Sequence, residues 1–357
     1  MEKKRLSKKK LALIIVACVI ISIPTIILPV STVVVYEAIF SMRFHTEEYL
    51  LFSPSEFEGL VAERSEFESN STLTGYKYSK EGMTPKGVIV IAHGLGDGGH
   101  NKYMPYIDKF TDYGYYVFGY DAQGTDESDK KAPEGFPQSI KDLDSAIDHV
   151  QSINEYKSLP IMLFGHSFGA YSVGNVLNHH PEVECAVMVA GFNESESMLG
   201  QYPRKVLGFL VDGVLLPYVS LYERIKFGKE YSKITAVDGM EMTDAEILIV
   251  HSQDDKRVPI EYGYEIYYEE FKDDERFHFI KYEDQGHSDM LYSQNAISYR
   301  AQLENSYQAY LSEAGKRDKD KVREEYMSKN INKKLYFEPN EELFEKIINL
   351  YNSSVLE

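Results

Sequence analysis

Five residues centred on Ser167 have the spacing expected of an activated serine. They read Gly165-His166-Ser167-Phe168-Gly169, with a small residue two positions before the serine and another two positions after it. This spacing lets a serine stand on a sharp turn between a strand and a helix, with its hydroxyl accessible. We therefore predict that Ser167 is a nucleophile and that Gly165 and Gly169 make room for its turn.

A serine hydroxyl is a weak nucleophile at neutral pH and needs a base, a group that orients the base, and donors for an oxyanion. Of the ten histidines, His287 is the predicted base because it follows the last predicted strand. His166, beside the serine, is expected to shape the turn. His251 ends a predicted strand and His278 lies within one, so both are expected to be packed.

The orienting acid is expected in the loop that ends at Val258-Pro259, which contains two adjacent aspartates. The spacing to this dipeptide favours Asp255, with Asp254 as the alternative. Glu194, after an earlier predicted strand, is a third choice. The carboxylate would hold the correct tautomer of His287 and stabilise its imidazolium form.

Two backbone N–H groups are expected to form the oxyanion hole. One belongs to Phe168, the residue after the serine, and the other to Leu95 in the loop His93-Gly94-Leu95-Gly96. His93 and Gly94 are predicted to support this loop, in which glycine lets the backbone approach a substrate closely. There is no Cys-x-x-Cys motif or Cys/His cluster, so neither a metal nor another cofactor is expected.

These residues need a scaffold, and the chain predicts strands that alternate with helices. Helical patterns such as 140–153 and 170–178 lie between short apolar runs. This alternation predicts an α/β fold, a mostly parallel sheet with helices on both faces. Stretches near Leu60 and Tyr76 could add edge strands. The runs predicted as buried strands are 87–92, 115–120, 161–164, 185–190, 247–250 and 277–280.

Two further segments do not fit a simple alternation. The interval 191–246 is too long for a crossover helix and contains an apolar stretch at 206–222, so it is predicted as a helical cap over the sheet. We place the catalytic domain at 57–312 and predict a helical C-terminal extension at 313–357.

The first 36 residues predict a single membrane span. Residues 1–10 are basic, and residues 11–36 carry no charge. A helix of that length exceeds the ~30 Å hydrocarbon core. The positive-inside rule then puts the N-terminus in the cytoplasm and the catalytic domain outside the cell membrane. A cleaved signal peptide is the alternative, and Ile15-Val16-Ala17-Cys18 resembles a lipoprotein cleavage box.

The charge of the chain argues against nucleic-acid partners. The formal net charge is −18 although the first ten residues are net positive, so the predicted catalytic domain is strongly acidic. Such a domain repels phosphate backbones. The two cysteines, Cys18 and Cys185, are not expected to form a disulfide, because Cys18 lies in the predicted span. The oligomeric state is left open.

Taken in order, the motifs resemble the α/β-hydrolase superfamily, in particular its monoacylglycerol-lipase-like and serine-aminopeptidase-like branch. The resemblance covers roughly 57–312 and also rests on Asp121-Ala122-Gln123-Gly124. It implies acyl transfer through an acyl-enzyme on Ser167. A small-molecule or lipid ester is the expected substrate, and a peptide or amide is the alternative. Gln123 and Asp126 depart from the usual D-x-R-G-x-G pattern, and Ser252 replaces a usual glycine.

One rival prediction uses the same glycines. Gly94-Leu95-Gly96-Asp97-Gly98-Gly99 fits G-x-G-x-x-G after a predicted strand, and Asp121 lies 22 residues beyond Gly99. That arrangement is typical of a dinucleotide-binding oxidoreductase. It would leave the serine turn and the Asp255/His287 pair unexplained. A non-catalytic binding module is a second rival, although all three positions of the expected triad hold competent residues.

Overall fold

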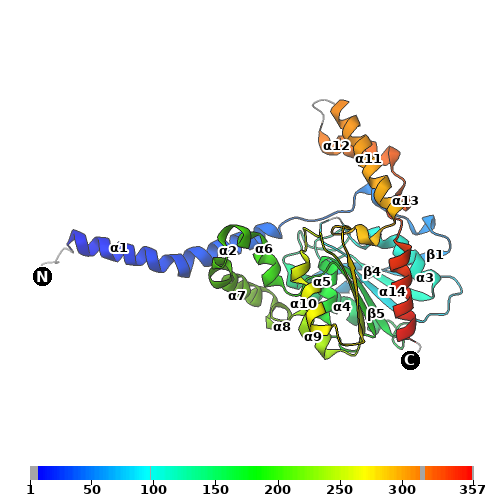
Figure 1. The fold of residues 1–357 in the computed structure, drawn as a ribbon, viewed down its shortest axis with the longest axis horizontal. Coiled ribbons are helices and arrows are strands. Elements are labelled where there is room, and N and C mark those ends of the chain that lie inside the picture. The colour runs from blue at the N-terminus through cyan, green and yellow to red at the C-terminus, as the bar shows by residue number, and fades with distance from the viewer. Residues whose placement is uncertain (1–6, 97, 314–317, 356–357) are drawn as a thin grey trace.

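An eight-stranded sheet lies at the centre of the structure, which is a computed structural model describing residues 7–96, 98–313 and 318–355 (Figure 1). The strands follow the spatial order β1-β2-β4-β3-β5-β6-β7-β8. β2 is antiparallel to both of its neighbours, and every other pair is parallel. The strands are β1 (Leu60–Glu68), β2 (Thr72–Lys80), β3 (Gly87–Ala92), β4 (Tyr115–Tyr120), β5 (Ile161–His166), β6 (Cys185–Val189), β7 (Glu246–Ser252) and β8 (Phe277–Tyr282).

All six apolar runs of the sequence form strands, and β3 and β4 have the predicted bounds. The stretches near Leu60 and Tyr76 are also strands. β1 is an edge strand as expected, but the expectation was wrong for β2. β2 lies inside the sheet because it pairs with β1 on one side and with β4 on the other.

Helices cover both faces of the sheet, and the alternation of side chains along the strands divides the core between them. In β3, for example, Val88 and Val90 face one core cluster, whereas Ile89 and Ile91 face the other. The first cluster lies under α4 (Phe136–Ser152), α5 (Phe168–Val176), α9 (Ala236–Met242) and α10 (Tyr264–Phe271), and the second under α3 (Met104–Asp112) and α14 (Glu341–Ser354).

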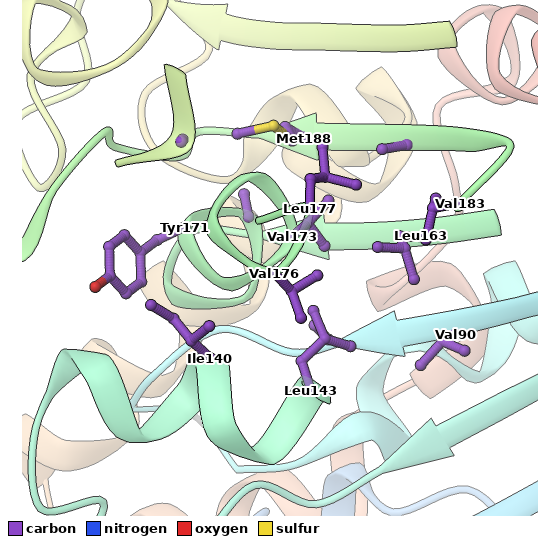
Figure 2. Packing of buried hydrophobic residues seen from close by; sticks show 14 of the residues in the cluster. Val90, Ile140, Leu143, Leu163, Tyr171, Val173, Val176, Leu177, Val183 and Met188 are labelled. Atoms are coloured by element: carbon purple, nitrogen blue, oxygen red, sulfur yellow. The ribbon is translucent and has the colours of Figure 1, made fainter. Parts of the chain in front are cut away.

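Figure 2 shows how α5 is held in the first cluster. Val173, Val176 and Leu177 lie among side chains of the strands and of α4, including Leu163 and Ile140. All five side chains are fully buried. Because α5 begins directly after Ser167, this packing fixes the position of the serine relative to the sheet.

The predicted cap is a group of helices that follows β6. It contains α6 (Ser195–Leu207), η5 (Val211–Leu215), α7 (Leu216–Phe227) and α8 (Lys229–Ser232), and it leads into α9. The turn between α6 and η5 exposes large apolar side chains, and Val206 and Phe209 are each 83% exposed.

A continuous helical run precedes the catalytic domain and extends away from it (Figure 1). It consists of α1 (Lys8–Ser22), η1 (Ile23–Ile27) and α2 (Leu28–Ile39). Among the described residues, Lys8–Ile39 is the one helix long and apolar enough to cross a membrane. Residues 1–6 of the predicted basic segment lie outside the described residues. The last turns of α2 are not free, because Tyr36 and Phe40 are buried against the cap.

The C-terminal region is helical in its described part, but it divides into two parts. α11 (Gln294–Glu313), α12 (Lys319–Asn330) and α13 (Lys333–Tyr336) form a small packed unit that projects from the sheet (Figure 1). α14 instead packs against β6 and β7, and Tyr351 Oη donates a hydrogen bond of 2.8 Å to the carbonyl of Leu163. The described end of the expected extension is therefore part of the sheet's core.

Candidate active site

Ser167 stands on a strained turn between β5 and α5. Its φ is 58° and its ψ −116°, a conformation that residues other than glycine rarely adopt. The predicted need for small neighbours has a direct cause. A Cβ on Gly169 would lie 1.9 Å from the carbonyl oxygen of Ala92, and one on Gly165 would lie 2.5 Å from that of Gly169.

The structure brings Ser167, His287 and Asp255 into one hydrogen-bonded line. His287 Nε2 lies 2.8 Å from Ser167 Oγ, and His287 Nδ1 lies 2.7 Å from Asp255 Oδ2. A carboxylate can only accept, so Nδ1 carries the proton and Nε2 is left to accept from the serine hydroxyl. This is the arrangement that allows a histidine to act as the base.

Asp255 is buried and heavily bonded. Its Oδ1 accepts hydrogen bonds from the backbone N–H groups of Arg257 (2.9 Å) and Val258 (3.0 Å), and its Oδ2 lies 3.3 Å from His251 Nε2. Burial by itself would raise the pKa of the Asp255 carboxyl, but the hydrogen bonds from His251 and His287 outweigh burial and lower that pKa. The carboxylate is therefore ionised when it faces His287.

The two other acids considered from the sequence lie elsewhere. Asp254 Oδ1 accepts hydrogen bonds from Ser252 Oγ (2.7 Å) and from the backbone N–H of Gly286 (2.8 Å). Asp254 thus braces the loop that carries His287 without touching the imidazole. Glu194 accepts a hydrogen bond from Ser197 in the cap.

His166 joins the serine turn to the histidine loop. Its Nε2 lies 3.2 Å from the carbonyl oxygen of His287, and its Nδ1 lies 3.1 Å from Tyr103 Oη. Tyr103 Oη also accepts a hydrogen bond of 3.4 Å from the N–H of Gly94. Burial, together with the nearby His287, lowers the pKa of His166 well below its ordinary value, so its imidazole is neutral. His166 thus has the shaping position expected of it, whereas Tyr103 had no distinguishing motif.

The two expected oxyanion donors belong to the first residue of α5 and to the loop that follows β3. The N–H of Phe168 belongs to the first turn of α5, where helical N–H groups have no acceptor within the helix. A Cβ on Gly94 would lie 3.5 Å from Ser167 Cβ, so the loop that carries Leu95 runs directly against the serine. His93 supports that loop, because its Nε2 accepts from the N–H of Ala122 and its Nδ1 donates to the carbonyl of Gly94, both at 2.8 Å.

The glycine loop does not have the surroundings that a dinucleotide site needs. In that reading, Asp121 would bind a ribose hydroxyl. Here its Oδ1 accepts from the backbone N–H (3.1 Å) and Nδ1 (2.7 Å) of His100, and its Oδ2 accepts from the N–H of Glu127. A Cβ on Gly99 would lie only 2.0 Å from Asp121 Oδ1. Gly99 and Asp121 are packed against each other, with no room for a ligand between these two residues.

One of the two departures from the D-x-R-G-x-G pattern has a clear structural use. Asp126 Oδ1 accepts from the backbone N–H of Thr46 (2.6 Å), and Asp126 Oδ2 accepts from Thr46 Oγ1 (2.6 Å) and from the N–H of Gly99 (2.7 Å). Arg43 adds hydrogen bonds of 2.6 Å to the carbonyls of Asp126 and Ser128. The segment that leaves the N-terminal helix is thereby tied to Asp126 and to Gly99, which follows the loop 93–96 expected to form the oxyanion hole.

Two other expectations concern ligands and packing. Within the part of the chain that the structure describes, no group of three or more His, Cys, Asp or Glu side chains could hold a metal ion. His251 is buried as expected, but the expectation was wrong for His278, whose side chain is 45% exposed and pairs with Glu246 at 2.7 Å. β8 is an edge strand, and His278 and Lys281 are its exposed residues.

Comparison with known proteins supports a serine hydrolase. Residues 83–227 match the family model described as serine aminopeptidase S33. The chain is 26% identical over 146 residues to the monoglyceride lipase of Mus musculus, an alignment that covers 39% of this chain and 48% of that protein. The chain therefore spans about half the length of this curated relative.

Solved structures are similar over a larger part of the chain. An esterase of Pyrococcus furiosus superposes with a TM-score of 0.53 at 17% identity, covering 76% of this chain and 98% of that one. The acylaminoacyl peptidase of Pyrococcus horikoshii gives a TM-score of 0.51 at 17% identity, covering 66% and 38%. At this identity the likeness concerns the fold alone, and the fold is the α/β-hydrolase fold.

Proposed function

We propose that the chain is a membrane-anchored serine hydrolase that cleaves a carboxylic ester through an acyl-enzyme on Ser167. The single observation that carries this proposal is the line of hydrogen bonds from Ser167 Oγ through His287 to Asp255. The serine hydrolases named among the similar proteins support the same reaction class.

In the proposed reaction, Ser167 Oγ attacks the carbonyl carbon of the ester while His287 Nε2 takes the hydroxyl proton. The carbonyl π electrons move to oxygen, and the N–H groups of Leu95 and Phe168 stabilise the resulting oxyanion. As the tetrahedral intermediate collapses, the ester C–O bond breaks and His287 gives its proton to the departing alcohol. A water molecule, deprotonated by His287, then releases the acid and restores Ser167 by the same route.

An ester is the first choice of substrate, with lipid and acylglycerol-like esters included. The chain is similar to a protein named monoglyceride lipase and to one named esterase. The apolar surface of the cap and the adjoining N-terminal helix favour a lipophilic substrate. An amide or peptide is the second candidate, because the family model that matches 83–227 is named for an aminopeptidase.

The membrane part of the proposal rests on the helix Lys8–Ile39 and on the basic residues before it. The positive-inside rule leaves the N-terminus in the cytoplasm and the catalytic domain on the other side of the cell membrane. Protease added to intact cells should therefore digest the catalytic domain. Protection of that domain until the cells are lysed would contradict this orientation.

The reaction class is tested with a fluorophosphonate probe on the folded full-length chain. We expect the probe to label the wild-type protein but not the Ser167→Ala variant, and Ser167→Ala to unfold at an unchanged temperature. Absence of labelling in the folded wild type would favour a non-catalytic binding module. Nitrophenyl esters assayed beside aminoacyl anilides then separate the esterase from the peptidase.

A further inference from the structure

An apolar pocket lies between the N-terminal helix and the cap. Val35 and Ile39 of α2 form one wall, and Leu199, Val211, Leu216 and Val219 of the cap form the other. We propose that this pocket binds the acyl chain of a lipid, so that the membrane anchor is itself part of the substrate site. The assignment of the chain to a substrate rests on the proposed ester hydrolysis, whereas the binding of an acyl chain does not.

The lining determines the chemical class of the ligand. Among the residues that the structure describes, no charged side chain faces the pocket, and its volume is about 160 Å³. The hydroxyl of Tyr36 is already engaged, because it donates a hydrogen bond of 2.8 Å to Glu223. Apart from the hydroxyl-bearing Ser31, Thr32 and Tyr36, the lining is apolar, which suits a hydrocarbon chain. A sugar or a charged peptide end would lose its hydrogen bonds there.

The position of the pocket along the helix places it at the edge of a bilayer. Lys8–Ile39 contains 32 residues, and about 20 of them suffice to cross a ~30 Å hydrocarbon core. If the core begins at Leu11, after the basic residues, it ends near Val30. The pocket residues of α2 then follow immediately, beside the cap helices α6 and α7 (Figure 1).

The tip of the cap would ease the entry of a lipid chain at this level. Val206 and Phe209 are each 83% exposed, and Leu207 and Leu210 beside them are about half exposed. Along the chain, these side chains lie between Pro203 and Val211, which both line the pocket. An acyl chain could therefore pass from the bilayer into the pocket along apolar surface without crossing water.

The pocket also adjoins the proposed active site. Three of its wall residues, Tyr36, Leu199 and Val219, pack in the same cluster as Leu95 of the oxyanion loop. Phe136, another member of that cluster, lies ring to ring with Phe168 at 5.9 Å. An acyl chain that extends from Ser167 past Leu95 would thus meet the aromatic cluster of Tyr36, Phe40 and Phe227, against which Leu199 and Val219 of the pocket wall also pack.

Polar contacts hold the helix against the cap, so the wall that it provides is built into the fold. Glu223 Oε1 accepts hydrogen bonds from Tyr36 Oη (2.8 Å) and from Ser195 Oγ at the start of α6 (2.5 Å). Glu37 accepts from Tyr222 Oη at 2.5 Å and pairs with Lys226. These bonds fix the position of α2 relative to the cap, which a helix that only attached the domain to a membrane would not require.

Two tryptophan variants of α2 test the proposal. Val35→Trp fills the pocket, whereas Val34→Trp adds the same bulk outside its lining; the two valines are similarly exposed, at 57% and 62%. Burial of one methylene is worth roughly fourfold in affinity, so loss of room for two methylenes costs about 15-fold. We expect Val35→Trp to lower kcat/KM for nitrophenyl laurate by about that factor, with nitrophenyl butyrate unchanged. Val34→Trp should change neither rate.

A binding measurement that needs no turnover keeps the two proposals separate. A diazirine-bearing lauric acid added to the detergent-purified full chain should label Leu199 and Val219, and Val35→Trp should suppress this labelling. Labelling at the exposed tip, Val206 and Phe209, is the internal reference and should not change. Equal labelling at Leu199 and Val219 in both variants would overturn the acyl-chain site. Loss of both esterase activities with retained pocket labelling would instead contradict only the proposed hydrolysis.

If Val35→Trp disturbs folding, Val35→Ala provides the opposite change. This smaller residue enlarges the pocket and should shift the ratio of laurate to butyrate hydrolysis toward laurate, and should increase labelling of Val219. An unchanged ratio together with unchanged labelling would contradict the proposal.

Discussion

Replacement of Asp255 by asparagine tests the proposed triad most directly. In the structure, Asp255 Oδ1 accepts from two backbone N–H groups, and Oδ2 faces His287 Nδ1. An asparagine side chain has one acceptor and one donor end. Its oxygen must take the Oδ1 position, because an amide NH₂ there would face two N–H donors. The NH₂ group is then forced toward His287.

The tautomer of His287 follows from that orientation. With a donor opposite Nδ1, the imidazole must carry its proton on Nε2, which points at Ser167 Oγ. Nε2 can no longer accept the hydroxyl proton. A wrong tautomer in such a triad lowers kcat by about 10⁴, or about 5 kcal/mol of transition-state stabilisation at 1.36 kcal/mol per tenfold.

Hydrolysis of nitrophenyl butyrate by Asp255→Asn and by Asp254→Asn gives the comparison. Asp254 accepts both of its hydrogen bonds on one oxygen, so an asparagine oxygen can keep them and the loss should stay within about tenfold. Both variants should unfold near the wild-type temperature. A near-normal rate for Asp255→Asn beside a large loss for Asp254→Asn would refute the assignment of the acid.

Three further changes have outcomes that follow from the structure. Burial raises the pKa of Glu223 from 4.5 to about 7 in the folded protein. The free energy of unfolding is therefore highest below pH 4.5, where Glu223 is protonated in both states, and it falls as the pH rises to about 7. Glu223→Gln should remove that loss, which amounts to about 3 kcal/mol, in denaturant unfolding between about pH 4 and pH 8. Asp126→Asn puts an amide donor against a backbone N–H of Thr46 or Gly99. We expect kcat to fall about tenfold with little change in KM. An unchanged kcat would exclude coupling between Asp126 and the expected oxyanion loop. Gly169→Ala should lower the melting temperature and abolish probe labelling, since its Cβ would lie 1.9 Å from a backbone oxygen of β3, whereas Gly213→Ala, with open space around it, should do neither.

The parts of the fold that could be predicted are those encoded by local patterns. Strands buried on both faces are short, continuous apolar runs, and β3, β4, β5, β6 and β7 were recognisable for that reason. The serine turn was recognisable because it requires glycine at two fixed positions. The proposed base and acid lie in loops that follow strands, so the order of the strands was enough to predict that His287 and Asp255 would meet Ser167, as the hydrogen bonds show.

The contacts that escaped prediction join segments far apart in the chain. Tyr103 is one of 28 tyrosines, and only the folded chain shows that its hydroxyl lies between Gly94 and His166. The C-terminal helix α14 has an ordinary amphipathic pattern, which gives no hint that it covers β6 and β7. Asp254 and Asp255 are neighbours in the chain, so their spacing to Val258-Pro259 differs by only one residue. The structure distinguishes them, because only the Asp255 carboxylate bonds His287 Nδ1, whereas Asp254 bonds Ser252 and Gly286.

The N-terminal segment is not structurally separate from the domain that follows it. Composition separates an uncharged helix from an acidic domain that was expected to begin near residue 57. Yet Tyr36 and Phe40 are buried against the cap, and Thr46 shares Asp126 with Gly99, which follows the expected oxyanion loop 93–96. Tyr36, Phe40 and Thr46 all precede residue 57, so the part of the chain that packs on the domain begins within α2. The segment proposed as a membrane anchor and the residues that follow it are therefore packed into the domain that carries the proposed active site.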